Sequence, residues 1–316
     1  MAMSDARHNS SRKTNASGEP TMVRGDGVRL SCHASGDPTQ PTIVFVHGYP
    51  DTHTVWDAVI AELESDFHCV RYDIRGAGNS SRPRRTSAYR LSHLRADLAA
   101  VIDWASPEAP VHLVGHDWGS IQSWEAVTDD TLAGRIASFT SISGPCLDHA
   151  GRWLRQRGQD KRTSTAKQLR KSWYIFAFHL PLLPALAWRS LMPRIWPQVT
   201  ARTEGESLAT SSTLARDGAY GVKLYRANVL PRLKNPRKRH ARMPVQVITP
   251  EHDAFVGPEV VDGLEQWVDD LTVTPIDAPH WAVLTDPEEI AGYCGDFIHR
   301  KSGRTTAHST PPGEPS

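Results

Sequence analysis

The segment Val111-His112-Leu113-Val114-Gly115-His116-Asp117-Trp118-Gly119-Ser120 decides the fold. Its first four residues predict a short buried strand, and a helical pattern begins after Asp117. Gly115 and Gly119 flank Asp117 with the spacing of a nucleophile elbow, usually written G-x-S-x-G, whose glycines allow a sharp turn and close packing of strand and helix. A carboxylate at the nucleophile position can attack a saturated carbon and form an ester. The alternative is that Asp117 only caps the helix, a role that Asp fills well.

Short β-rich runs alternate with helical patterns on both sides of this segment. Such alternation is typical of a mostly parallel sheet covered by helices. Near the start, a Gly25-Asp26-Gly27 turn predicts a hairpin. The strands we expect are residues 22–24, 28–34, 43–46, 69–72, 111–114, 136–142, 245–248 and 271–276, with helices at 55–63, 91–104 and 287–298. The sequence therefore predicts an α/β fold with a mostly parallel, eight-stranded sheet.

The middle of the chain has a different pattern. Residues 147–240 contain aromatics, prolines and helical runs but no convincing strand. We therefore expect a helical cap at 147–240, inserted into an α/β core made of residues 21–146 and 241–302. Residues 1–20 and 303–316 are polar and lack periodicity, so we expect disordered tails there, the second of them a tail or a linker.

Composition excludes several classes of protein. The 316 residues hold 36 Lys and Arg against 35 Asp and Glu, a net charge of +1, whereas nucleic-acid-binding proteins usually show a basic excess. The first twenty residues have no apolar h-region, and no apolar stretch reaches the length of about 18 residues that spans a bilayer. The four cysteines lie far apart and form no CxxC pair, which is typical of reduced thiols. We therefore expect a globular cytoplasmic protein that binds no nucleic acid, and the oligomeric state stays open.

A second loop, His47-Gly48-Tyr49-Pro50, follows another predicted buried strand. Its glycine and proline predict a sharp turn that can point a backbone amide at the elbow. The backbone N–H groups of Tyr49 and Trp118 would then form an oxyanion hole. The alternative is an ordinary turn at the end of a strand.

Two further residues complete a catalytic pattern. Asp253 and His280 each follow a predicted strand late in the chain. With Asp117 they give a nucleophile, an acid and a histidine in the chain order expected of an α/β-hydrolase triad. A lone acid or histidine is more often structural, but joint placement at three strand ends is hard to obtain by chance.

Other candidate sites are weaker. The glycine-rich residues 73–80 lack the Lys and Ser/Thr of a P-loop, so they predict a turn rather than a nucleotide site. No HExxH occurs, and His112 and His116 would lie roughly 13 Å apart along a strand and its turn, too far to share a metal. We therefore expect neither a metal nor a cofactor.

Together these motifs resemble the epoxide hydrolase family of α/β-hydrolases, over about residues 22–301. The resemblance rests on the HGxP loop, the GHDWG elbow and the late Asp and His. It implies two cap tyrosines that hold and protonate the epoxide oxygen, matched by Tyr174 in a helical segment ending in proline and by Tyr225 in a Tyr-Arg-x-Asn segment. Phenols suit this role because they stay protonated at neutral pH. Helix packing is the other explanation for both residues, Tyr220 is the rival of Tyr225, and the resemblance also implies a cis Tyr49–Pro50 bond.

The chain also resembles the hydrolase half of mycobacterial proteins that join an epoxide hydrolase to a short-chain dehydrogenase. Residues 139–145 (FTSISGP) and the Ser172-Trp173-Tyr174 segment carry this likeness. No dinucleotide-binding motif is present, so no NAD site is expected. The resemblance implies that an apolar epoxide, lipid-derived ones included, and water form a vicinal diol through an ester on Asp117. A haloalkane-type dehalogenase with the same Asp–His–Asp triad and a non-catalytic ligand-binding hydrolase fold are the alternatives.

Charge is distributed unevenly near the end of the cap. Residues 223–242 hold eight Lys/Arg and no acid, while residues 251–270 hold seven acids and no Lys or Arg. Solvated faces of opposite charge explain this most simply. The alternative is peripheral contact between the 223–242 stretch and an anionic membrane that carries a lipid substrate.

Overall fold

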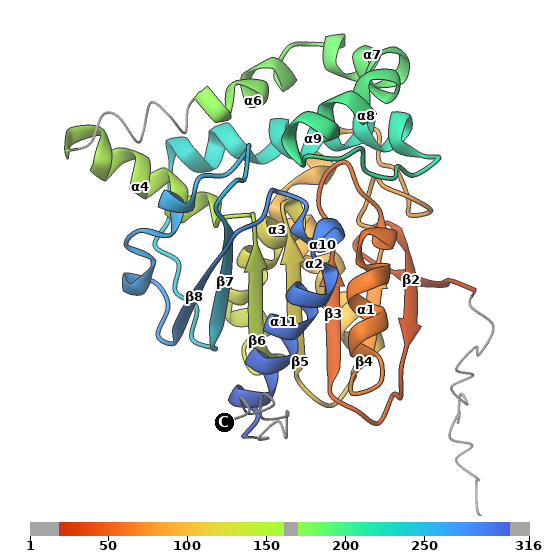
Figure 1. Cartoon of the computed structure of the whole chain (residues 1–316), viewed down its shortest axis with the longest axis vertical. Helices are drawn as coiled ribbons and strands as arrows, with labels where there is room; N and C mark the ends of the chain where they lie inside the picture. Colours follow the sequence, from red (N-terminus) through yellow and green to blue (C-terminus); the bar gives the residue numbers. More distant parts are fainter. Residues whose placement is uncertain (1–18, 161–169, 304–316) are drawn as a thin grey trace, which may run out of the picture.

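A computed structural model describes residues 19–160 and 170–303, and an eight-stranded sheet forms its centre (Figure 1). The strands lie in the order β1-β2-β4-β3-β5-β6-β7-β8. Pairing is parallel from β4 onward, whereas β1 and β2 pair antiparallel with each other and β2 with β4. The predicted mostly parallel sheet of an α/β-hydrolase fold is confirmed. The strands are β1 (Thr21–Arg24), β2 (Arg29–Ser35), β3 (Thr42–Val46), β4 (His68–Tyr72), β5 (Val111–His116), β6 (Ile136–Ile142), β7 (Val245–Pro250) and β8 (Leu271–Ile276).

Helices cover both faces of this sheet (Figure 1). Every residue of β3 and β5 is buried, as their continuous apolar runs predict, and alternate residues of β3 join two separate hydrophobic clusters. The cluster with Ile43 contains side chains of α1 and α11, and the cluster with Val44 contains side chains of α2 and α3. These helices are α1 (Asp57–Leu63), α2 (Leu91–Ala105), α3 (Trp118–Val127) and α11 (Pro287–Lys301), with the short α10 (Ala282–Thr285) before α11.

All three expected helices depart from their predicted bounds, the one expected at 91–104 by a single residue. The helix expected at 55–63 begins instead with a 3-10 turn at His53–Trp56, in which the Val55 amide donates to the Thr52 carbonyl at 3.1 Å. The closing helix runs past residue 298 to Lys301, because a basic last turn interacts favourably with the helix dipole. All four cysteines are free and buried.

The chain leaves the sheet after β6 and returns at β7, and the elements between them are helical throughout the described residues (Figure 1). β6 and β7 are parallel neighbours that align Phe139 with Val245, so the insertion connects the end of one strand to the start of the strand beside it. It lies where we expect the cap, whereas the expected tails fall mainly on residues 1–18 and 304–316, outside the described residues. Within the ranges that the structure describes, no helix is both long and apolar enough to cross a membrane. The cap helices are α4 (Leu147–Asp160), α6 (Trp173–Phe178), α7 (Leu183–Ser190), α8 (Met192–Thr203) and α9 (Leu214–Lys234).

Part of the basic 223–242 stretch turns inward and fastens the cap to the core. Arg232, Arg237 and Arg239 surround the buried carboxylates of Glu125 on α3 and Asp148 on α4. The shortest contact joins an Arg239 Nη to a Glu125 Oε at 2.7 Å, and Arg232 bridges both acids. These three cations therefore have an internal role and do not simply form a solvated face.

Arg239→Ala should lower the free energy of unfolding by about 2 kcal/mol, because it removes charge-assisted hydrogen bonds to the buried Glu125 and Asp148, which keep Arg232 and Arg237 as partners. The side chain of Arg239 is 7% exposed, so solvent cannot replace it. Urea unfolding followed by circular dichroism measures the change. Arg242→Ala, at an exposed position nearby, is the control and should be nearly neutral. Equal losses in the two variants would show that the network does not stabilise the fold.

Candidate active site

Asp117 lies in a strained turn between β5 and α3. Its φ of 50° and ψ of −120° are unusual for any residue except glycine. The turn needs Gly119, where a Cβ would come within 1.9 Å of the Val46 carbonyl oxygen, and Gly48, where it would lie 2.5 Å from the Asp117 Cβ. The Asp117 side chain accepts no capping hydrogen bond from α3, so helix capping does not explain this residue.

Two backbone amides reach the Asp117 carboxylate. Tyr49 donates its N–H to Asp117 Oδ1 at 2.7 Å, and the amide of the adjacent Trp118 helps to stabilise the charge of the same carboxylate. The Tyr49–Pro50 bond is cis, as the family resemblance predicts. Both residues of the predicted oxyanion hole therefore lie beside the nucleophile position.

His280 and Asp253 lie on the other side of Asp117. His280 Nδ1 bonds Asp253 Oδ2 at 2.8 Å, and His280 Nε2 lies 3.9 Å from Asp117 Oδ2. Asp253 is fixed in turn, because its Oδ1 accepts the amides of Phe255 and Val256 at 2.7 and 2.8 Å. The structure thus brings together the three residues of the predicted triad, with the imidazole between the two carboxylates.

Burial and neighbouring charges set the ionisation of this triad. Burial raises the pKa of Asp117 to about 6, although the charge of His280 and the two amides oppose the change. Burial works against a charged His280, yet the carboxylates of Asp253 and Asp117 outweigh it and raise the pKa of His280 to about 9. Burial likewise tends to raise the pKa of Asp253, but His280 outweighs it and the pKa lies below its ordinary value. At neutral pH the resting site therefore holds an imidazolium between two carboxylates.

Two cap helices bring tyrosines to the same place. Tyr174 of α6 and Tyr225 of α9 pack edge to face with ring centroids 5.9 Å apart. The Tyr225 ring also contacts the rings of Trp118 and Tyr49, at 4.9 and 5.4 Å. Burial chiefly, and the Asp117 charge next for Tyr174, hold the pKa of both phenols above the ordinary value, so both stay protonated.

The rival residue, Tyr220, lies elsewhere. Its ring packs under the ammonium group of Lys223, with Nζ 3.9 Å from the ring centroid. It has no ring contact with the aromatic side chains around Asp117 among the described residues. The geometry therefore favours Tyr225 over Tyr220.

Two acids near the triad, the half-buried Asp51 and the buried Glu204, escaped the sequence-based prediction. Asp51 accepts the Trp281 indole N–H at 3.0 Å, and Glu204, at the end of α8, accepts the Trp281 backbone N–H at 2.8 Å. Burial raises the pKa of Asp51 to about 7. Asp51 directly follows the HGYP loop and could have been found from that position. Nothing in the sequence around Glu204 points to the site.

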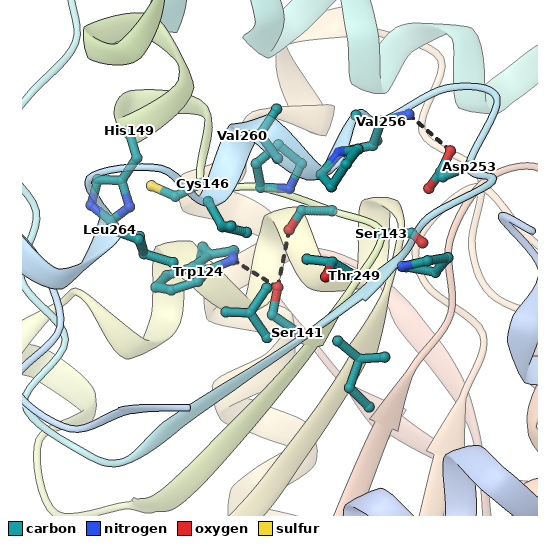
Figure 2. Close-up of a pocket in the computed structure, with 18 residues that line it drawn as sticks. Trp124, Ser141, Ser143, Cys146, His149, Thr249, Asp253, Val256, Val260 and Leu264 are labelled. Carbon is teal, nitrogen blue, oxygen red and sulfur yellow. Dashed lines mark hydrogen bonds between the residues drawn. The ribbon is translucent and has the colours of Figure 1, made fainter. Parts of the chain in front are cut away.

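A separate cavity lies behind Asp253, at the ends of β6 and β7 (Figure 2). Its walls include Trp124 and Ser141, which are joined by a 3.1 Å hydrogen bond from the indole. Of the residues predicted for catalysis, only Asp253 lines it. Because Asp117 and His280 do not line this cavity, we do not assign it to the substrate.

The histidines discounted as metal ligands have other partners. His112 Nδ1 bonds Ser138 Oγ at 2.8 Å, and His116 Nε2 bonds the His280 carbonyl oxygen at 2.9 Å. Within the described ranges, no three His, Cys, Asp or Glu side chains are grouped so as to hold a metal ion.

Comparison with known proteins gives consistent matches. The alpha/beta hydrolase fold family matches residues 41–287. The chain is 36% identical over 291 residues to "Probable oxidoreductase EphD" of Mycobacterium tuberculosis, covering 88% of this chain and 49% of that protein. It thus spans about half the length of the mycobacterial relatives it matches. It is 28% identical to epoxide hydrolase 3 of Xenopus tropicalis, over 87% of this chain and 76% of that protein. Among solved structures, an epoxide hydrolase from Bacillus megaterium with a bound diol product superposes with a TM-score of 0.73 at 22% identity, covering 88% of this chain and 100% of that one.

Proposed function

The chain belongs to the α/β-hydrolase fold family, and from this premise we propose that it is an epoxide hydrolase that converts an apolar epoxide to a vicinal diol. The observation that carries the proposal is the convergence of Tyr174 and Tyr225 from the cap on Asp117 in the core. A nucleophilic carboxylate needs no phenols to attack a carbon. Phenols are needed when the leaving atom is an oxygen that must receive a proton.

In the first step, Asp117 attacks an epoxide carbon. A bond forms between a carboxylate oxygen and that carbon, the carbon–oxygen bond of the epoxide breaks, and its electron pair stays on the oxygen. Tyr174 or Tyr225 donates a proton to this oxygen, which becomes a hydroxyl group. Aromatic rings of Tyr49, Phe178 and Phe255 surround the phenols, which favours an apolar substrate.

In the second step, His280 activates water. Esterification removes the negative charge of Asp117, and this charge helps to raise the pKa of His280. The pKa of the imidazole therefore falls once the ester forms, and the ring gives its proton, by way of solvent, to the tyrosine that protonated the epoxide oxygen. The neutral ring can then accept a proton from water. The resulting hydroxide attacks the ester carbonyl, and the amides of Tyr49 and Trp118 bind the oxyanion. The bond between the carbonyl carbon and the substrate oxygen then breaks, and that oxygen takes the proton from His280 to complete the diol. The regenerated Asp117 carboxyl returns its own proton to the His280 ring. Asp253 orients the ring and stabilises its charge.

A panel of aliphatic and aromatic epoxides, with diols measured by mass spectrometry, tests the proposal. Diol formation by the wild type and its absence from Asp117→Asn are the expected results. No diol from any epoxide of the panel would contradict it.

A dehalogenase is the second candidate, because the indole N–H of Trp118 is buried beside Asp117 without a hydrogen-bond partner among the described residues. The Trp118 Nε1–H lies near the Tyr225 hydroxyl but makes no hydrogen bond of normal geometry, although it is buried. A weak donor beside the nucleophile could bind a departing halide. The two phenols still favour the epoxide.

The kcat/KM for epoxide should fall as the pH decreases through about 6, because protonation of Asp117 removes the nucleophile. Above this pH the carboxylate is ionised, so kcat/KM should level off. Initial rates at low substrate concentration across the acid range measure the profile. The exposed His252, paired with Asp277, gives a control, and His252→Gln should leave the midpoint unchanged. A flat acid profile would contradict an essential carboxylate at Asp117.

A further inference from the structure

The outer side of the cap carries an unusual apolar surface, here called the cap patch. Seven of the ten exposed large hydrophobic side chains in the described residues fall within residues 173–191, so they form one group rather than a scatter. A monomeric protein in water rarely exposes a contiguous apolar patch, and such a patch usually marks an interaction site. The cap patch consists of Trp173, Phe176, Leu180, Leu182, Leu183, Leu186 and Leu191.

The cap patch lies directly above the candidate active site. Helix α6 turns Tyr174 and Phe178 inward toward Tyr225, while Trp173 and Phe176 on the same helix face solvent. Helices α6 and α7 form the edge of the cap that lies away from the sheet (Figure 1). One short helix thus separates the outer apolar surface from the proposed epoxide site.

Packing among the residues that the structure describes does not explain the exposed leucines. Leu182 is 74% exposed and adopts φ 60° and ψ −42°, an unfavourable conformation for a leucine. Trp173 is 68% exposed on α6. An apolar side chain held out by a strained backbone points to a surface that meets something other than the described residues.

The charges within the segment that carries the cap patch are of one sign. Residues 170–203 contain five Lys or Arg and no Asp or Glu. None of the ion pairs found in the described part of the chain involves Arg189, Arg194, Lys223 or Arg226. Burial, together with the charges of Arg189 and Arg226, lowers the pKa of Lys223 to about 8, so these cations lie close to one another. By contrast, the arginines on the inner side of the cap pair with buried acids.

We propose that the cap patch is a membrane-binding surface that docks on an anionic phospholipid bilayer. Trp173 and the leucines would enter the headgroup region, and the surrounding Arg and Lys would contact lipid phosphates. A second copy of the chain fits less well, since a symmetric interface would bring two cationic rims together. The docked cap would place α6 and the site behind it against the bilayer. An apolar substrate could then pass from the bilayer directly into the site. This inference extends the proposed function, but binding is measured without turnover and is judged separately.

Co-sedimentation with phosphatidylcholine vesicles, with and without phosphatidylglycerol, tests whether the apolar side chains of the cap patch bind the bilayer. The wild type should bind the phosphatidylglycerol vesicles roughly tenfold more tightly than neutral ones, and less tightly at high salt. The triple variant Leu182→Gln, Leu183→Gln, Leu186→Gln should lose roughly tenfold or more of this binding. The double variant Met22→Gln, Val273→Gln is the matched control, because these side chains are 42% and 43% exposed on the edge strands. It should bind as the wild type does.

A second pair of variants locates the charge contact. Arg189→Gln, Arg194→Gln should weaken binding to the anionic vesicles, whereas Lys234→Gln, Lys238→Gln in the 223–242 stretch should have a smaller effect. Full binding by the triple leucine variant would overturn the proposal, and so would loss of binding in the Lys234/Lys238 pair alone. A leucine-dependent dimer in light scattering, without vesicle binding, would also overturn it and assign the patch to self-association.

Hydrolysis of a short, water-soluble epoxide without lipid separates this inference from the proposed function. All the patch variants should turn over that substrate at the wild-type rate, because none of their residues lies at Asp117. Vesicle binding by a protein that hydrolyses no epoxide would keep the membrane surface and reject the hydrolase.

Discussion

His280→Gln is expected to accumulate a covalent ester between Asp117 and the substrate. Glutamine cannot take a proton from water, and loss of a general base slows such a step by roughly 10²–10⁴-fold. The attack of Asp117 on the epoxide needs no base, so the ester should still form. Intact-mass spectrometry should show a mass increase equal to the whole epoxide, and peptide mapping should place it on Asp117.

Asp117→Asn is the control, because a neutral amide is a poor nucleophile and should give no adduct. His252→Gln changes an exposed histidine away from the site and should turn over as the wild type does. An adduct on the Asn variant, or none on a folded His280→Gln protein, would rule out the two-step mechanism through Asp117.

The double variant Tyr174→Phe, Tyr225→Phe should lose nearly all epoxide turnover. Each hydroxyl is a donor needed mainly in the transition state, and by analogy with an oxyanion-hole donor its loss costs about 3 kcal/mol. Folding should survive, because the phenyl rings keep the edge-to-face contacts of Tyr225 with Trp118 and Tyr49. Diol formation is measured for the wild type, both single variants and the double variant.

Tyr220→Phe is the matched control for this experiment. Tyr220 lies on the same helix as Tyr225, but its ring contacts Lys223 rather than the site, so its loss should leave turnover unchanged. Bromide release from a matched bromoalkane is recorded in parallel. Brisk bromide release that does not depend on the tyrosines, with no diol formed, would reject the epoxide and support the dehalogenase.

The sheet was predictable from the sequence because its signals are local. Continuous apolar runs such as residues 43–46 and 111–114 indicate strands buried on both faces, and β3 and β5 are buried at every residue. The elbow was predictable for a similar reason, since Gly115 and Gly119 allow the close packing of strand and helix that the sharp turn at Asp117 requires. The bounds of the helix expected at 55–63 were wrong, because apolar spacing does not distinguish a 3-10 turn from the start of an α-helix.

Long-range partners could not be predicted in the same way. The arginines of the 223–242 stretch resemble a solvated charge run until Glu125 and Asp148, about a hundred residues earlier, are placed against them. Glu204 likewise lies beside Trp281 only because α8 packs over the end of the sheet. The roles of Asp117, His280, Asp253, Tyr174 and Tyr225 remain predictions that the variants above test.

The insertion of the cap between two adjacent strands has an evolutionary consequence. Because β6 and β7 pair directly, the helices between them can be lengthened, shortened or exchanged without changing the register of the sheet. Asp117, Asp253 and His280 lie on core loops, whereas Tyr174 and Tyr225 belong to the insertion. Selection could therefore change the leaving group of the reaction, from an oxygen to a halide, by changing one contiguous segment of the coding sequence. In such lineages the core residues proposed to form the ester would stay the same, and the sequence differences that accompany a change of substrate would lie in the cap.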